Sequence, residues 1–191
     1  KPSGTVSQLV DSASGIHARH NPYYIRTVRG DNKDPLTEFM RESGIPNEPD
    51  YLKPDHTTVF SFPMMAPKGS VCRHDMTAIE QLEIWKIYAK HWCEHKPSVT
   101  ISVKEDEWVP VGAWCWDNFQ YLSGVSFLPF SDHTYQQAPY QDIDEKEYKK
   151  LVKKMPTSID WQKLQDYEKE DNTKGSQELA CTAGVCELVD I

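Results

Sequence analysis

The sequence lacks the features that mark several large classes of protein. Within its 191 residues no apolar run approaches the ~20 residues that a membrane-spanning helix needs. The opening segment, Lys1 to Thr5, contains no apolar core of the kind found in signal peptides. Hydrophobic residues make up only 38% of the chain, which is low for a self-contained globule. The net charge of −8 argues against a protein that coats nucleic acid, because such proteins usually present a basic face. We therefore expect neither a membrane segment nor direct nucleic-acid contact.

The cysteines are few and irregularly placed. The chain has five of them, Cys72, Cys93, Cys115, Cys181 and Cys186. An odd number without regular spacing does not fit a secreted disulfide framework, so we expect reduced thiols in a cytoplasmic protein. The chain also opens without Met and enters a glycine-containing motif at once. This favours a piece of something longer, whether a split subunit, a processed product or a truncated chain.

Strands and helices are expected to alternate along most of the chain. Hydrophobic patterning predicts strands at 23–28, 57–62, 98–103 and 124–129, and helices at 34–44, 77–92, 107–120 and 144–154. The second helix has the clearest start, a capping box formed by Thr77 and Glu80. Pro63 is expected to end the second strand, residues 124–129 to form a buried strand, and residues 45–56 a loop. This order favours an α/β fold with parallel strand pairing.

The composition changes near residue 157. From there the sequence turns polar, and residues 166–178 contain almost no apolar side chains. Such a stretch is typical of a linker or mobile tail. We therefore divide the chain into a folded part, 1–156, and a polar tail, 157–191.

The N-terminal thirty residues are locally basic within an acidic protein. Small hydroxyl residues surround a glycine in the segment Lys1-Pro-Ser-Gly-Thr-Val-Ser7. Such a loop can aim several backbone N–H groups at one phosphate, although an ordinary turn has the same composition. The Gly-Lys-Ser/Thr ending of a Walker A loop is absent. Five nearby side chains are candidates for contact with an anion: His17, Arg19, His20, Arg26 and Arg29.

Two cysteines lie close together near the end of the chain. Four small or flexible residues separate Cys181 from Cys186, which would allow a reversible disulfide. The alternative is two unrelated cysteines in a frayed end. A structural metal site is not expected there, because a tetrahedral site needs two more ligands. His91 and His95 have helical spacing, but Trp92 replaces the glutamate of a metalloprotease helix, so we expect no metal there either.

Six blocks of the sequence, in order, resemble the C-terminal part of an adenosylcobalamin-dependent (class II) ribonucleotide reductase. They are KPSGTVSQLVDSASGIHARH at 1–20, YYIRTVRGDNKDPL at 23–36, VFSFP at 59–63, WCEHKPSVTISV at 92–103, GVSFLPFSDHTYQQAPYQ at 124–141 and CTAGVC at 181–186. The resemblance implies an α/β fold that is the distal half of a ten-stranded barrel, followed by a flexible C-terminal tail. It would cover only the last quarter to third of a full-length enzyme.

The resemblance also implies a function. The enzyme would convert ribonucleotides to deoxyribonucleotides by a radical mechanism, with adenosylcobalamin as cofactor. Pro2, Ser3, Gly4, Thr5 and Ser7 would hold the substrate phosphates. Cys181 and Cys186 would re-reduce an active-site disulfide and be regenerated by a thioredoxin-like reductant. The family's Asn-x-Cys-Gly-Glu motif does not occur here, so the radical cysteine is expected in an upstream part, on the same or a separate chain.

Two other functions remain open from the residues alone. One is a non-catalytic module that binds nucleotide phosphates. The other is a small thiol–disulfide exchange protein, although thioredoxin-like enzymes place a Cys-x-x-Cys pair at a helix start.

Overall fold

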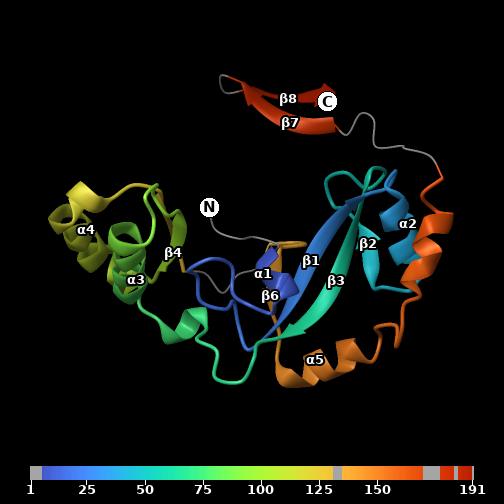
Figure 1. The fold of residues 1–191 in the computed structure, drawn as a ribbon, viewed down its shortest axis with the longest axis horizontal. Helices are drawn as coiled ribbons and strands as arrows, with labels where there is room; N and C mark the ends of the chain where they lie inside the picture. The colour runs from blue at the N-terminus through green and yellow to red at the C-terminus, as the bar shows by residue number, and fades with distance from the viewer. Residues whose placement is uncertain (1–5, 131–134, 170–176, 183–184, 191) are drawn as a thin grey trace. The chain divides into compact units, whose positions relative to one another are not determined.

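The computed structural model describes residues 6–130, 135–169, 177–182 and 185–190, and it is a mixed α/β structure. The chain divides into two compact units, which are considered one at a time (Figure 1). The first unit consists of Lys1–Tyr24 and Met64–Thr134. The second consists of Ile25–Pro63 and Tyr135–Ile191.

The first unit contains a strand–helix–strand element. Strands β4 (Val99–Val103) and β5 (Val125–Pro129) pair in parallel, with Val99 opposite Val125 and Val103 opposite Pro129. Helix α4 (Trp108–Asp117) lies between them in the sequence. The parallel pairing predicted for an α/β chain is thus confirmed for these strands. The shorter helices of this unit are α1 (Val6–Leu9), η1 (Arg73–Asp75), η2 (Glu105–Glu107) and η3 (Phe119–Tyr121).

Helix α3 (Ala78–His91) packs against β4 to form the core of the first unit. Leu82 and Trp85 are completely buried in the cluster that also contains Ile101 of β4. The indole Nε1–H of Trp85 donates to the carbonyl of Pro97 at 2.8 Å, so this buried polar group is satisfied. The predicted capping box is confirmed, because the main-chain N–H of Thr77 donates to Glu80 and that of Glu80 donates to the Thr77 hydroxyl.

A four-stranded sheet has the order β2-β3-β1-β6. Its strands are β1 (Tyr23–Asp31), β2 (Asn47–Pro49), β3 (Thr57–Met65) and β6 (Tyr140–Asp142). The end of β1 meets the start of β3, where Asn32 N donates to His56 O at 2.8 Å, so these neighbours run antiparallel. Strand β2 is also antiparallel to β3, with Glu48 opposite Val59.

The prediction of parallel pairing is therefore wrong for β1, β2 and β3. The reason is the short strand β2, which lies inside the predicted loop 45–56. Its residues include Pro49, and prolines are typical of loops, but an edge strand tolerates one. Because β2 reverses the chain, β3 inserts antiparallel between β1 and β2.

Helix α2 (Pro35–Glu42) begins as predicted, with the Asp34 carboxylate accepting from Leu36 N. Gly44 follows it in the left-handed conformation, with φ +80°. The buried Phe39 of α2 packs against two aromatic rings, with its centroid 5.4 Å from that of Trp161 and 5.5 Å from that of Tyr167. The part of the chain beyond residue 157 is thus anchored to α2 at η4 (Trp161–Asp166) and at Tyr167. The boundary at 156/157 stays a prediction.

Two further differences concern strand ends and burial. Strand β3 continues through Pro63 to Met65. Strand β2 pairs only with Thr58–Phe60, so β3 loses no hydrogen bond to β2 because Pro63 lacks an N–H group.

The predicted burial of the 124–129 strand is wrong, because Leu128 of β5 is 55% exposed. Val125 and Phe127 of β5 pack against the core, whereas Ser126 and Leu128 on the other face are exposed.

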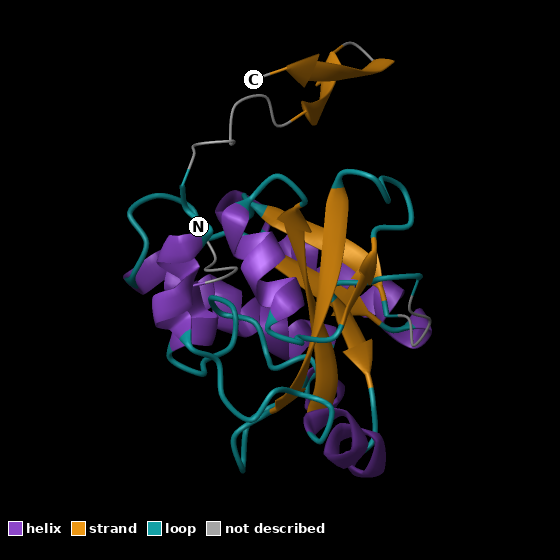
Figure 2. Cartoon of the chain, turned by 90° about the vertical axis from the view of Figure 1, so that its right-hand side faces the viewer, coloured by secondary structure: helices purple, strands orange, loops and turns teal. Residues whose placement is uncertain are grey.

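The remaining elements are helix α5 (Glu145–Val152) and a C-terminal hairpin. The hairpin consists of the antiparallel strands β7 (Gln177–Thr182) and β8 (Val185–Asp190) (Figure 2). The sequence analysis placed these residues in the polar tail, although β7 and β8 contain apolar residues such as Leu179, Val185 and Leu188. Over the residues that the structure describes, no helix is long and apolar enough to cross a membrane.

Candidate functional site

The predicted phosphate loop is described only at its end. Pro2, Ser3, Gly4 and Thr5 lie outside the described residues. Ser7 lies on α1 and is 8% exposed. Its carbonyl accepts from Val10 N at 3.3 Å and from Ser12 N at 3.0 Å. The main chain of Ser7 therefore helps to close the turn at the end of α1.

A buried arginine fixes the chain just after α1. Arg19 is 5% exposed, and its guanidinium donates to Asp11 Oδ1 at 2.8 Å, to the Asp11 carbonyl and to the Tyr24 hydroxyl. Asp11 has φ +48°, a left-handed conformation that costs a non-glycine residue energy. Burial by itself would lower the pKa of Arg19, but the hydrogen bonds to Asp11 and Tyr24 raise it overall. Arg19 is thus a permanently charged clamp on Asp11.

The other arginines expected to meet an anion also have protein partners. Arg29 donates through Nε to Asp50 Oδ2 at 2.8 Å and through Nη2 to the Gln137 carbonyl at 3.2 Å. The Arg26 guanidinium lies over the Tyr140 ring, 4.4 Å from its centroid. Arg19 belongs to the first unit, whereas Arg26 and Arg29 belong to the second. The structure therefore shows each of these three arginines in contact with other groups of its own unit.

The histidines expected to meet an anion are engaged as well. His17 Nδ1 lies 2.7 Å from the Ser14 carbonyl, and Nε2 lies 3.1 Å from Thr100 N. One neutral tautomer satisfies both contacts, with Nδ1–H as donor and Nε2 as acceptor. Both ring nitrogens then have partners within the chain, and the expected anion contact of His17 stays a prediction. His20 lies edge-on to the Tyr24 ring, with centroids 5.9 Å apart.

The first unit contains a pocket of about 760 Å³ that the sequence analysis missed. Apolar side chains such as Ile16, Val71 and Ile79 line it. Four carboxylates line it too, those of Asp11, Asp75, Glu80 and Glu83. Arg19 lines the pocket as well but is paired with Asp11, so the other three carboxylates disfavour a phosphate inside it. Its residues come from three separate segments without a common motif, so no sequence pattern reveals it.

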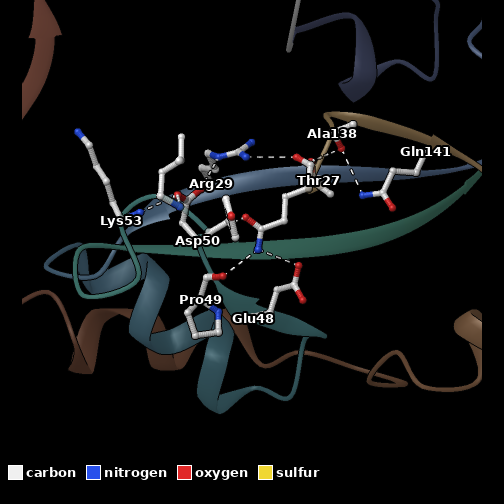
Figure 3. A network of polar contacts seen from close by, with 11 residues as sticks. Thr27, Arg29, Glu48, Pro49, Asp50, Lys53, Ala138 and Gln141 are labelled. Atoms are coloured by element: carbon white, nitrogen blue, oxygen red, sulfur yellow. Dashed lines mark hydrogen bonds and ion pairs between the residues drawn. The ribbon is translucent and has the colours of Figure 1, made fainter. Parts of the chain in front are cut away.

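A second site missed by the sequence analysis is a polar network in the second unit (Figure 3). Gln137 is 6% exposed and has φ +56°. Its Oε1 accepts from Tyr51 N at 2.8 Å, and its Nε2 donates to Glu48 Oε1 at 2.9 Å and to the Pro49 carbonyl at 2.8 Å. A single buried glutamine produces no recognisable sequence pattern, although Gln137 lies within the 124–141 block of the sequence analysis.

Asp50 anchors the other side of this network. Its carboxylate accepts from Arg29, Leu52 N and Lys53 N. Burial pushes the pKa of Asp50 upward, but the hydrogen bonds from Arg29 and from the two main-chain groups outweigh it and leave this pKa below 3.8. Thr27 of β1 also donates to the Ala138 carbonyl at 2.9 Å. The network thus fixes the segment around Gln137 and Ala138 to β1 and to the β2–β3 loop.

The C-terminal cysteines occupy opposite positions in the hairpin. The register of β7 and β8 pairs Cys181 directly with Cys186, and Thr182 with Val185 closes the ladder. Opposed positions on antiparallel strands bring two residues within the Cα separation that a disulfide requires. The backbone register therefore suits a reversible disulfide.

Two of the remaining thiols, those of Cys72 and Cys115, have shifted pKa values. Burial raises the pKa of Cys72, which Asp75 raises further, and burial also raises the pKa of Cys115. Both thiols are therefore protonated near neutral pH and are weak nucleophiles. In the described ranges, no group of three or more His, Cys, Asp or Glu residues is arranged to hold a metal ion. We assign none of these residues to a corrin, since four carboxylates line the pocket of the first unit.

The comparisons with known proteins point to one class of enzyme. No family model matches the chain. The chain is 35% identical over 168 residues to a probable adenosylcobalamin-dependent ribonucleoside-triphosphate reductase of Dictyostelium discoideum, covering 86% of this chain and 22% of that protein. It is 31% identical to the corresponding reductase of Euglena gracilis, covering 83% of this chain and 22% of that protein. A B12-dependent (class II) ribonucleotide reductase crystal structure matches its fold with a TM-score of 0.71, at 24% identity, over 90% of this chain and 24% of that chain.

The fold is thus that of part of a class II ribonucleotide reductase. The curated relatives of this chain are adenosylcobalamin-dependent ribonucleoside-triphosphate reductases, which confirms the resemblance found in the sequence. The chain spans about a quarter of the length of these relatives or less, between 22% and 26%.

Proposed function

We propose that this chain is the C-terminal portion of a cytoplasmic class II ribonucleotide reductase. The observation that carries the proposal is the match to such reductases along 86% of the chain at 35% identity. The class II fold over 90% of the chain supports it. A separate phosphate-binding module and a thiol–disulfide exchange protein are not favoured by these relatives.

The proposed reaction is the reduction of a ribonucleoside triphosphate to its deoxy form, as the names of the relatives suggest. Adenosylcobalamin, when bound, supplies the radical that a cysteine outside this chain carries. The 2′-hydroxyl leaves as water, and a dithiol in the active site supplies two electrons and becomes a disulfide. We assign to this chain the next step, in which Cys181 and Cys186 reduce that disulfide and become oxidised themselves. A thioredoxin-like dithiol then reduces them again.

The first unit is proposed to be one part of the ten-stranded barrel. In the described part of the chain, β4 and β5 have only each other as partners. Parallel strands normally lie inside larger sheets, because both of their faces need cover. The open edges of this pair support the proposal that the rest of the enzyme continues the sheet.

The N-terminal segment is proposed to hold the substrate phosphates. Pro2, Ser3, Gly4, Thr5 and Ser7 would supply main-chain N–H groups and hydroxyls to the phosphate oxygens. The supporting observation is the fixed end of this segment, where Ser7 is buried and Arg19 clamps Asp11. A fixed end reduces the conformational entropy lost when the segment orders around an anion.

A chimaera tests the proposed function. This chain would replace the matching segment of the Dictyostelium reductase, and reduction of ribonucleoside triphosphates would be measured with added adenosylcobalamin. We expect cofactor-dependent turnover. Ser3→Ala and Thr5→Val should each lower kcat/KM by a factor corresponding to about 1–3 kcal/mol per charge-assisted bond. Ser126→Ala, on the exposed face of β5, is the matched control. A folded but inactive chimaera, or unchanged kinetics in both loop variants, would contradict the respective assignment.

A further inference from the structure

Helix α4 presents an apolar face to solvent that the core of its own unit does not use. On one side, Val111 is buried, and Trp114 and Cys115 pack against the core. On the opposite side, Val109 and Trp116 are each 83% exposed, and they are one helical repeat apart. The following turn adds Phe119, which is 73% exposed. We call Val109, Gly112, Ala113, Trp116 and Phe119 the α4 face.

Charged side chains interrupt the exposed surface of the neighbouring helix α3, which packs on the same core. Glu80, Glu83 and Lys90 are exposed there, together with Ile87 and Tyr88. Helix α4 has no charged residue from Trp108 to Trp116. Soluble monomers rarely expose contiguous aromatic surface of this kind, which instead marks an interface.

The middle of the α4 face is built for close approach. Gly112 lies in a helix interior, where glycine destabilises a helix by about 1 kcal/mol relative to alanine. A Cβ built on Gly112 would have no atom within 4 Å, so no contact inside this chain requires a glycine there. A small residue between Val109 and Trp116 instead leaves room for another backbone, since the distance between packed helices depends on the side chains at the contact.

The charges around the α4 face indicate what covers it. Glu105 and Asp106 are exposed just before α4, and Asp117 is exposed at its end. A second copy of this chain, packed face to face about a two-fold axis, would bring these like charges together. A partner helix with an apolar face and basic ends would complement them.

We propose that the α4 face docks a helix of the remaining part of the reductase polypeptide, packed closely over Gly112. The relatives place more than three quarters of the enzyme outside this chain, because the chain covers 22% of the Dictyostelium protein. This inference rests on the proposed function and assigns one surface through which the two parts assemble.

The test uses this chain and the remainder of the Dictyostelium reductase as two separate polypeptides, whose association is measured by titration calorimetry. Gly112→Leu should weaken the association by about tenfold or more, since central interface positions dominate binding. Gly112→Ala is the matched control and should change it little. Neither variant should lower the unfolding temperature of the isolated chain, and both should raise it slightly, because the space beside Gly112 is open and alanine and leucine favour a helix more than glycine does. Hydroxyl-radical oxidation of Trp116 should fall on assembly, with buried Trp85 as internal standard.

The outcomes are distinct. Association that is insensitive to Gly112→Leu, with Trp116 equally oxidised in both states, would overturn this inference and leave the proposed function standing. Self-association of the isolated chain that Gly112→Leu abolishes would make a second copy the occupant and would also overturn it. Failure of the unaltered chain to associate with the remainder would contradict the proposed function, and this inference with it.

Discussion

Arg19 holds Asp11 by its main chain and its side chain together, donating to the carboxylate at 2.8 Å and to the carbonyl of the same residue. The carboxylate is largely exposed, with 60% of the Asp11 side chain accessible, whereas the arginine side chain is 5% accessible. The two partners therefore differ in what their removal leaves behind. Loss of Asp11 would leave a buried cation without its counter-charge.

Asp11→Ala should lower the free energy of unfolding by about 2–3 kcal/mol, because an uncompensated buried charge is strongly unfavourable. Alanine would also be strained at φ +48°. Asp11→Asn should have a smaller effect, since asparagine tolerates the left-handed conformation and keeps a carbonyl acceptor. Urea denaturation of both variants measures this, with the exposed Asp106→Ala as control. Equal effects of Asp11→Ala and Asp106→Ala would show that the clamp does not stabilise the fold.

The ion pair of Arg29 and Asp50 predicts a pH dependence of stability. The pKa of Asp50 is lower in the folded chain than its ordinary value of 3.8, so the folded state favours the ionised carboxyl. The stability from this group is complete above pH 3.8 and is lost as the pH falls below 3.8 through the folded-state pKa.

Asp50→Asn should therefore destabilise the chain at pH 6 and flatten the decline of the urea midpoint below pH 3.8. The effect will be modest, because the Arg29 side chain is 43% exposed and its pairing is screened by water. Asp106→Asn serves as the control on an exposed carboxylate. A decline that stays as steep in Asp50→Asn as in the unaltered chain would contradict the assignment.

Gln137 combines two separable contributions to stability. Gln137→Ala removes three hydrogen bonds to the β2 region and leaves alanine at φ +56°. We expect a loss of about 2–4 kcal/mol in the free energy of unfolding. Gln137→Gly loses the same hydrogen bonds without the strain, so it should be about 1 kcal/mol more stable than the alanine variant.

The control for Gln137 is Gln141→Ala, which removes one long contact of 3.4 Å to the Ala138 carbonyl. That variant should unfold close to the unaltered chain in chemical denaturation. If glycine and alanine at position 137 proved equally unstable, the positive φ would contribute nothing to the cost.

The C-terminal pair predicts a split between two reductants. In the chimaera, Cys181→Ser or Cys186→Ser should abolish turnover driven by a thioredoxin system, because a single remaining thiol cannot close the intramolecular disulfide that the proposed exchange requires. Turnover driven by dithiothreitol should persist, since a small dithiol reaches the active-site disulfide directly. Cys93→Ser, at a half-buried free thiol, should change neither rate. Full thioredoxin-driven activity in both variants, or loss of the dithiothreitol reaction as well, would refute a shuttle.

The predictable parts of the fold are those set by local chemistry. The capping box at Thr77, the N-cap at Asp34 and the parallel strands around α4 all follow from residues near one another in the sequence. Strand β2 was hidden because Pro49 and the prolines around it are also typical of loops, and because its pairing depends on β3. Likewise, the count of arginines near the N-terminus gave the local charge but could not show that Arg19 and Arg29 are paired with carboxylates.

The pairing of β1 with the segment before β6 also bears on the order of folding. Thr27 bonds to Ala138, 111 positions further along the chain, whereas β4, α4 and β5 follow one another directly. Closing a long loop costs more conformational entropy than closing a short one, and distant pairings slow folding. The β4–α4–β5 element can therefore form early and locally. Strand β1 is synthesised well before its neighbour β6, so its edge stays exposed to chaperones or to wrong partners until β6 has been made.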